Sequence, residues 1–78
     1  MTARDEILIA ARELASRSAD SAFTLGDVLA LMHQRGTQYA DSTVRTHITS
    51  RMCANAPDHH ATVFQDFVRI DLGRYRLA

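Results

Sequence analysis

The apolar residues near the start of the chain recur at the spacing of one helix face. They form a stripe made of Ile7, Leu8, Ala11, Leu14 and Ala15. Thr2 is followed three residues later by Asp5, which is the spacing of a capping box. This pattern predicts a helix over residues 3–17, followed by a polar loop at 18–21.

A second helix begins after a short apolar segment. Thr24 is placed to be its N-cap, with Asp27 at the third helical position. Phe23 and Val28 stand on either side of this cap, at the spacing of a hydrophobic staple. The pattern ends at residue 35, and Gly36 is suited to a left-handed C-cap. Residues 21–23 could also form a very short strand before the helix.

The third apolar stripe consists of Val44, Ile48 and Met52, which are four residues apart. It predicts a helix over about residues 42–54, with Asp41 or Ser42 as the cap, and Pro57 confirms that the helix has stopped by then. Residues 56–62, which include Asp58, His59 and His60, are expected to form an exposed loop.

The period changes from helical to alternating near the C-terminus. Val68 and Ile70 alternate with polar residues, and Tyr75 and Leu77 do the same after a tight turn at Leu72-Gly73. This pattern predicts a β-hairpin with those four apolar side chains toward the core. The outer face would then carry Arg69, Arg74 and Arg76. The expected fold is α+β and mostly α, as a single domain over residues 1–78.

The polar face of the third helix has an unusual composition. It carries Ser42, Thr46, Thr49 and Ser50 roughly opposite the apolar stripe, with Arg45 beside them. A helix face that only meets solvent normally carries Glu and Lys, and this face has neither. Short hydroxyls and arginine suit phosphate oxygens and base edges. The face is therefore a candidate nucleic-acid surface, and the alternative is a polar face in contact with solvent.

Three segments resemble small bacterial winged helix-turn-helix modules, which occur alone or beside restriction and other DNA-processing domains. The segments are Phe23-Thr-Leu-Gly-Asp-Val28, Ser42-Thr-Val-Arg-Thr-His-Ile48 and Phe67-Val-Arg-Ile-Asp-Leu-Gly-Arg-Tyr-Arg-Leu77. The resemblance implies that the third helix enters the major groove and that the hairpin touches the flanking backbone. Carried over by position, the DNA-binding residues would be Ser42, Thr43, Arg45, Thr46, Thr49, Ser50, Arg69, Arg74 and Arg76. The implied role is transcription regulation or DNA recognition for another protein.

The net charge of the chain argues against DNA binding, whereas its arginine content argues for it. Nine basic residues balance nine acidic ones, whereas nucleic-acid-binding domains are usually basic overall. Every basic residue is arginine, whose planar fork suits phosphate and guanine better than the point charge of lysine. A composition bias of the genome would explain the same arginine content. One small module buries only about 600–1,000 Å² on DNA, so specificity would need a homodimer or a protein partner besides double-stranded DNA.

The main alternative is a protein-interaction adaptor of the same fold, since fold does not fix function. It predicts an exposed apolar patch, with Phe64, Phe67 and Leu72 as the candidates. Such an adaptor would bind a protein and no nucleic acid.

Catalysis, metals, cofactors and membranes are not expected. The chain has no Gly-rich phosphate loop and no nucleophile elbow. The spacing of His33, His47, Cys53, His59 and His60 matches no standard zinc site. A single cysteine fits a reducing cytoplasm. No apolar run approaches the roughly 18 residues of a membrane span.

Overall fold

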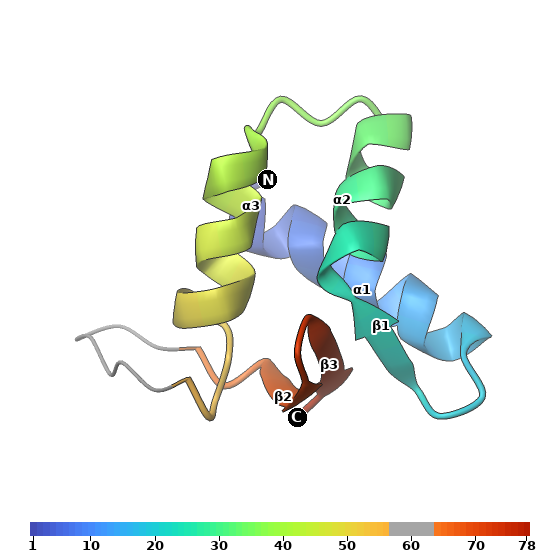
Figure 1. Ribbon diagram of the computed structural model, residues 1–78. Helices are drawn as coiled ribbons and strands as arrows, with labels where there is room; N and C mark the ends of the chain where they lie inside the picture. The colour runs from blue at the N-terminus through green and yellow to red at the C-terminus, as the bar shows by residue number, and fades with distance from the viewer. Residues whose placement is uncertain (57–63) are drawn as a thin grey trace.

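The computed structural model describes residues 1–56 and 64–78, so most of the predicted exposed loop at 56–62 lies outside the described residues. The described part is an α+β structure, as expected. In chain order its elements are α1 (Ala3–Arg17), β1 (Ala22–Thr24), α2 (Leu25–Gln34), α3 (Asp41–Thr46), a π-helical turn η1 (His47–Arg51), β2 (Phe67–Asp71) and β3 (Arg74–Leu77) (Figure 1). None of the helices in residues 1–56 and 64–78 has the length and apolar character needed to cross a membrane.

The helices form one layer of the molecule and the sheet covers one end of it. Helices α2 and α3 lie side by side, joined at the top of the view, and α1 crosses behind them (Figure 1). The sheet is antiparallel with the order β1-β3-β2. The core forms where α1, α2 and α3 meet the sheet, and its largest fully buried side chains include Phe67, Ile7, Ile48 and Met52.

The predicted helix caps of α1 and α2 are confirmed. The Asp5 amide donates to Thr2 Oγ1 at 3.2 Å, and the Thr2 amide donates to Asp5 Oδ2 at 3.0 Å, which completes a capping box. The Asp27 amide donates to Thr24 Oγ1 at 3.0 Å at the start of α2. Gly36 follows α2 with φ of 74°, a conformation that glycine adopts without the steric cost of a side chain. These local signals place both helices on the predicted residues.

The apolar stripe of the third helix is confirmed, but its backbone differs from the prediction. Val44, Ile48 and Met52 are all buried. The α-helical part ends at Thr46, and the π-helical turn ends at Arg51 instead of near residue 54. The Met52 amide donates to the carbonyl of His47 at 2.7 Å, which is the i→i+5 bond of a π-helix. An α-helix has 3.6 residues per turn, so residues four apart drift slowly around it. The wider π-helical turn reduces this drift and keeps the Met52 side chain in the same core as Val44 and Ile48.

The predicted cap of this helix is also wrong. The N-cap position is Ala40, which has no side chain able to bond the free amides, and Asp41 is the first helical residue. Asp41 Oδ1 instead lies 2.5 Å from Nε2 of His33 on α2. The carboxylate therefore ties the start of α3 to α2.

The hairpin forms as predicted, but the inward side of β2 is the opposite of the predicted one. The register pairs are Phe67–Leu77, Val68–Arg76, Arg69–Tyr75 and Asp71–Arg74. Paired residues of antiparallel strands share a face, so Phe67 and Tyr75, both buried, define the core face. Val68 lies on the other face, and Ile70 is the extra residue of a β-bulge and is 40% exposed. Arg69 therefore does not share the outer face with Arg74 and Arg76.

Backbone hydrogen bonds between β2 and the segment after η1 determine which side of β2 faces the core. The Phe67 amide donates to the carbonyl of Met52 at 2.8 Å, and the Ala54 amide donates to the carbonyl of Phe67 at 2.7 Å. A bidentate ion pair at 2.8 and 2.9 Å between Arg4 and Asp66 holds the residue just before β2 against α1. These contacts orient the Phe67 ring into the core, where it meets Phe23 edge to face at a centroid distance of 5.0 Å.

Candidate nucleic-acid interface

The outer face of α3 and η1 collects the six site residues predicted on the third helix. Four of them are exposed: Ser42, Arg45, Thr46 and Thr49. Thr43 and Ser50 are half-buried at its margins. Because Val44 and Ile48 anchor the opposite side in the core, this orientation is fixed by burial of apolar surface.

A shallow hollow of about 280 Å³ lies on this face. It is lined by Ser42, Thr43, Thr46, His47 and Arg51. These side chains offer three hydroxyls, one imidazole and one guanidinium, and the lining includes no carboxylate. Hydroxyl, imidazole and guanidinium groups can all donate hydrogen bonds to anionic oxygens. The hollow is therefore suited to a phosphate group of a nucleic-acid backbone.

His47 has one ring nitrogen already committed. Its Nδ1 lies 2.8 Å from the carbonyl oxygen of Thr43, and because a carbonyl can only accept, Nδ1 carries the hydrogen. This bond orients the ring and leaves Nε2 as the nitrogen for a ligand. The His47 side chain is half-buried.

Arg51 is a member of this surface that the sequence reasoning missed. Residues 43, 47 and 51 are four apart, so they share one face of a helix beside the apolar stripe. Arg51 therefore lies beside His47 at the hollow. Neither Arg45 nor Arg51 forms an ion pair with any residue that the structure describes. Within residues 1–56 and 64–78, both guanidinium groups are therefore without an acidic partner and can meet a ligand.

The hydroxyl of Thr49 is more restricted than those at the hollow. Its Oγ1 donates to the carbonyl oxygen of Arg45 at 2.8 Å, a common back-bond of threonine in helices. The hydroxyl hydrogen is then used within the helix, and Oγ1 can still accept. Thr49 is therefore better placed to accept from a base amino group than to donate to a phosphate.

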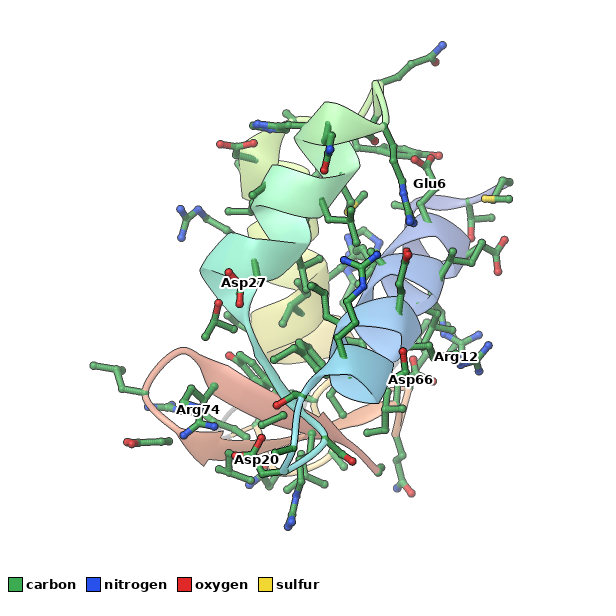
Figure 2. The ribbon with its side chains drawn as sticks, turned by 90° about the vertical axis from the view of Figure 1, so that its right-hand side faces the viewer. Glu6, Arg12, Asp20, Asp27, Asp66 and Arg74 are labelled. Atoms are coloured by element: carbon green, nitrogen blue, oxygen red, sulfur yellow. The ribbon has the colours of Figure 1, made fainter. Side chains whose placement is uncertain are left out.

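The hairpin arginines do not join this surface in the way that the sequence suggested. Arg74 Nη2 lies 2.7 Å from Asp20 Oδ2, and the two side chains lie together at one end of the sheet (Figure 2). The Leu25 amide donates to the carbonyl of Gly73 at 3.0 Å, which docks the turn on the start of α2. The turn is therefore tied to α2 at Gly73, while Leu72 beside it is 83% exposed.

Arg69 and Arg76 lie on different faces of the hairpin. Arg76 is exposed on the outer face, between Val68 on β2 and Ala22 on β1. The backbone of Arg69 is held by Asn55, whose side chain bonds its amide at 2.9 Å and its carbonyl at 3.0 Å. Of the three hairpin arginines, Arg76 alone is on the outer face without an ion pair in the described part of the chain.

The pairing of Arg74 makes a testable prediction about Asp20. The Ser18 hydroxyl, the Ala22 amide and Arg74 all bond its carboxylate and lower the pKa of Asp20 from 3.8 to about 2. Because the folded pKa lies below the unfolded one, the carboxylate's contribution to stability is present above 3.8 and is lost as pH falls through about 2. A carboxyl NMR titration should give a midpoint near 2 for Asp20.

Two substitutions test the causes of that shift separately. Ser18→Ala and Arg74→Gln should each raise the Asp20 midpoint, since the Ser18 hydroxyl and the Arg74 guanidinium both lower its pKa. A wild-type midpoint near the ordinary 3.8 would contradict the ion pair and leave Arg74 free for a ligand.

The apolar patch expected for an adaptor is not formed by the three predicted residues. Phe67 is fully buried. Phe64 is half-buried, with the Arg4 guanidinium 4.0 Å from its ring centre. Leu72 is 83% exposed at the hairpin turn. A single exposed leucine is ordinary for a protein surface.

The described residues show no cluster of three or more His, Cys, Asp or Glu side chains that could hold a metal ion. Cys53 is buried, and its Sγ lies 3.1 Å from Asn55 Oδ1. His59 and His60 lie outside the described residues.

Comparison with known proteins gives one match. No curated protein and no solved structure matches the chain. A family model described as "Domain of unknown function (DUF7669)" matches residues 4–77. Since this match spans nearly the whole chain, the protein belongs to the DUF7669 family.

Proposed function

We propose that this protein is a winged helix-turn-helix domain that binds double-stranded DNA, with α3 and η1 in the major groove. It would act as a small regulator or as an accessory DNA-recognition module. The element order, the sheet order β1-β3-β2 and the uncovered outer face of α3 support this assignment. A helix that exposes one face is the element that such domains insert into the groove.

The observation that carries the proposal is the chemistry of this outer face. Arg51 lines a hollow together with three hydroxyls and His47, and Arg45 is exposed on the same helix; neither arginine forms an ion pair in the described structure. Asp41, the one carboxylate in the stretch 41–51, is held by His33. Asp41 itself is exposed, so this helix presents two arginines against one carboxylate, although the chain as a whole is neutral.

The two arginines would have different roles. Arg45 lies near the start of the helix, where side chains reach base edges, and its fork can bind a guanine through two hydrogen bonds. Arg51 and His47 border the hollow and would hold a backbone phosphate, which fixes the position of the helix without reading sequence.

The hairpin would contribute less than the helix. Arg76 can meet the backbone directly, whereas Arg74 must first leave Asp20. The short docked turn gives no reach into a minor groove. Affinity would therefore be modest, and useful specificity would come from a second copy or a partner protein.

A fluorescence anisotropy titration with a mixed-sequence duplex, at low and at raised salt, tests the proposal. We expect binding that weakens steeply with salt, because each phosphate contact releases counterions. Thr46→Glu places a carboxylate in the centre of the face and should abolish binding.

Ala19→Glu is the matched control. It adds the same charge in the exposed turn between α1 and β1, which lies on the other side of the molecule from α3 (Figure 1). This variant should bind like the wild type. Absence of wild-type binding at tens of micromolar would contradict the proposal and favour a protein-interaction adaptor.

A further inference from the structure

The exposed side of α1 carries a stripe that is symmetrical about Ile9. Five exposed residues follow one another at spacings of three and four: Thr2, Asp5, Ile9, Arg12 and Ser16. Residues at these spacings share one face of a helix. Read outward from Ile9, the stripe has an acid on one side and a base on the other, then a hydroxyl at each end. Ile9 itself is 47% exposed, which leaves apolar surface at the centre.

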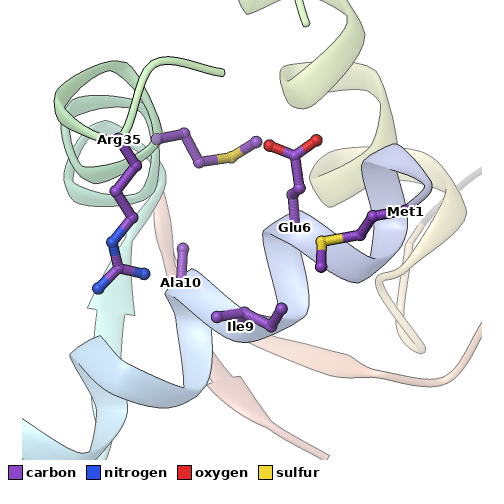
Figure 3. A pocket seen from close by; sticks show the side chains of 6 residues that line it. Met1, Glu6, Ile9, Ala10 and Arg35 are labelled. Atoms are coloured by element: carbon purple, nitrogen blue, oxygen red, sulfur yellow. The ribbon is translucent and has the colours of Figure 1, made fainter. Parts of the chain in front are cut away.

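A hollow of about 220 Å³ adjoins Ile9 where α1 meets the end of α2 (Figure 3). Its apolar lining comes from Met1, Ile9, Ala10 and Met32, and Glu6 and Arg35 border it. The two charged groups are already engaged: Glu6 accepts from the Thr37 hydroxyl at 3.0 Å, and Arg35 pairs with Glu13. The hollow therefore offers apolar contact between two charged side chains that already have partners.

The charges of the stripe are only partly used within the chain. Asp5 Oδ2 accepts from the amide and the hydroxyl of Thr2, and Oδ1 has no partner among the residues that the structure describes. Arg12 makes no ion pair with a described residue, and it points outward from α1 on the side away from α2 (Figure 2). Asp5 and Arg12, which are seven residues apart on one face of α1, can therefore both contact a partner.

We propose that a second copy of this chain docks on this stripe, with the two α1 helices antiparallel about a twofold axis at Ile9. At about 1.5 Å rise per residue, Asp5 lies about 6 Å to one side of Ile9 and Arg12 about 4.5 Å to the other. In an antiparallel pair, Arg12 of the second copy therefore lies almost level with Asp5, and the symmetry forms this ion pair twice. Thr2 meets Ser16 in the same way.

Charge complementarity identifies a second copy as the occupant. An unrelated apolar peptide would use Ile9 and the hollow but would have no reason to match an acid and a base placed on either side of them. The Ile9 side chains meet at the centre, beside the two hollows. One helix from each chain makes a small interface, so the dimer should be weak and depend on concentration.

The dimer is tested by sedimentation equilibrium of the full chain over a wide concentration range. The wild type should change from the mass of one chain toward that of two as concentration rises. Ile9→Ser should remove this change. Leu72→Ser removes a more exposed apolar side chain from the hairpin turn and should leave the change intact.

Charge exchange distinguishes the proposed orientation from any other. Arg12→Glu alone should be monomeric, because it places two acids opposite each other, and Asp5→Lys alone should be monomeric for the opposite reason. An equimolar mixture of the two variants should form dimers again, since each Asp5 then meets an Arg12 and each Glu meets a Lys. Circular dichroism of each variant reports whether α1 keeps its helix without the Asp5 cap.

Each result supports or overturns the proposal. Recovery of dimers in the mixture would establish the antiparallel pairing. A wild type that stays monomeric at millimolar concentration would overturn it, as would a dimer that Ile9→Ser leaves unchanged. The DNA titration is a separate measurement, so failure of the dimer leaves the proposed DNA binding intact, and failure of DNA binding leaves the dimer intact.

Discussion

Replacing Phe67 by alanine should lower the free energy of unfolding by about 3–5 kcal/mol, the range found when large aromatic side chains are removed from cores. Phe67 has no exposed surface, and its ring packs against Phe23 at 5.0 Å with an interplanar angle of 72°. Alanine would leave a cavity between the sheet and the helices. It would also remove the edge-to-face contact between the two rings.

Ile70→Ala is the matched control for this prediction, because it shortens an apolar side chain three residues further along β2. Ile70 is 40% exposed at the bulge, so its loss should change stability by less than about 1 kcal/mol. Urea unfolding followed by circular dichroism measures both variants.

A small domain has a total stability of only about 5–15 kcal/mol, so Phe67→Ala could be largely unfolded. Phe67→Leu fills part of the cavity and should give a smaller, measurable loss. A large loss of stability at Ile70 with a small loss at Phe67 would contradict this structure, because it would mean that the opposite side of β2 faces the core.

Positions 67 and 70 show that the sequence pattern alone does not determine which side of β2 is buried. Phe67, Val68 and Ile70 are all apolar, so alternation alone permits either side of β2 to face inward. The choice depends on backbone bonds from Phe67 to Met52 and Ala54, which local pattern does not contain. The bulge then shifts the remaining residues of the strand.

Helices α1 and α2 were predictable because their boundaries depend on local chemistry. Thr2 and Thr24 cap the amides within three residues of themselves, and Gly36 ends α2 by its own backbone conformation. The third helix lacks such a cap, since Ala40 occupies the N-cap position. Its start was therefore assigned to the wrong side chain, although its buried stripe was correct.

The candidate site was predictable in part for the same reason. The apolar stripe fixes which side of α3 faces solvent, and this placed Ser42, Arg45 and Thr46 correctly. Arg51 was missed because it lies beside the apolar stripe and not opposite it, although its spacing of four from His47 puts the two side by side. The ion pair of Arg74 could not be predicted from local sequence either, since its partner Asp20 lies 54 residues earlier in the chain.

Arg45→Gln and Arg51→Gln should weaken DNA binding in two different ways. If Arg45 holds a guanine edge, its loss should cost about 1–3 kcal/mol on a preferred site, and the advantage of that site over mixed sequence should shrink. If Arg51 holds a phosphate at the hollow, its loss should weaken binding to all sequences about equally. The slope of log affinity against log salt should then fall by about one.

Duplexes selected from a random pool would supply the preferred site, and anisotropy titrations at several salt concentrations would measure both variants. Arg17→Gln is the matched control, since it removes the same charge at the end of α1, where Arg17 pairs with Glu13. It should leave both the preference and the salt slope unchanged.

Equal salt slopes for Arg51→Gln and the wild type would remove Arg51 and the hollow from the DNA contact. An unchanged sequence preference in Arg45→Gln would remove Arg45 from base reading. Both arginines lie on one helix and neither forms an ion pair with a described residue, so a difference between the two variants would indicate that the two side chains contact different parts of the DNA. The two slopes and the two preferences together would therefore orient α3 in the groove.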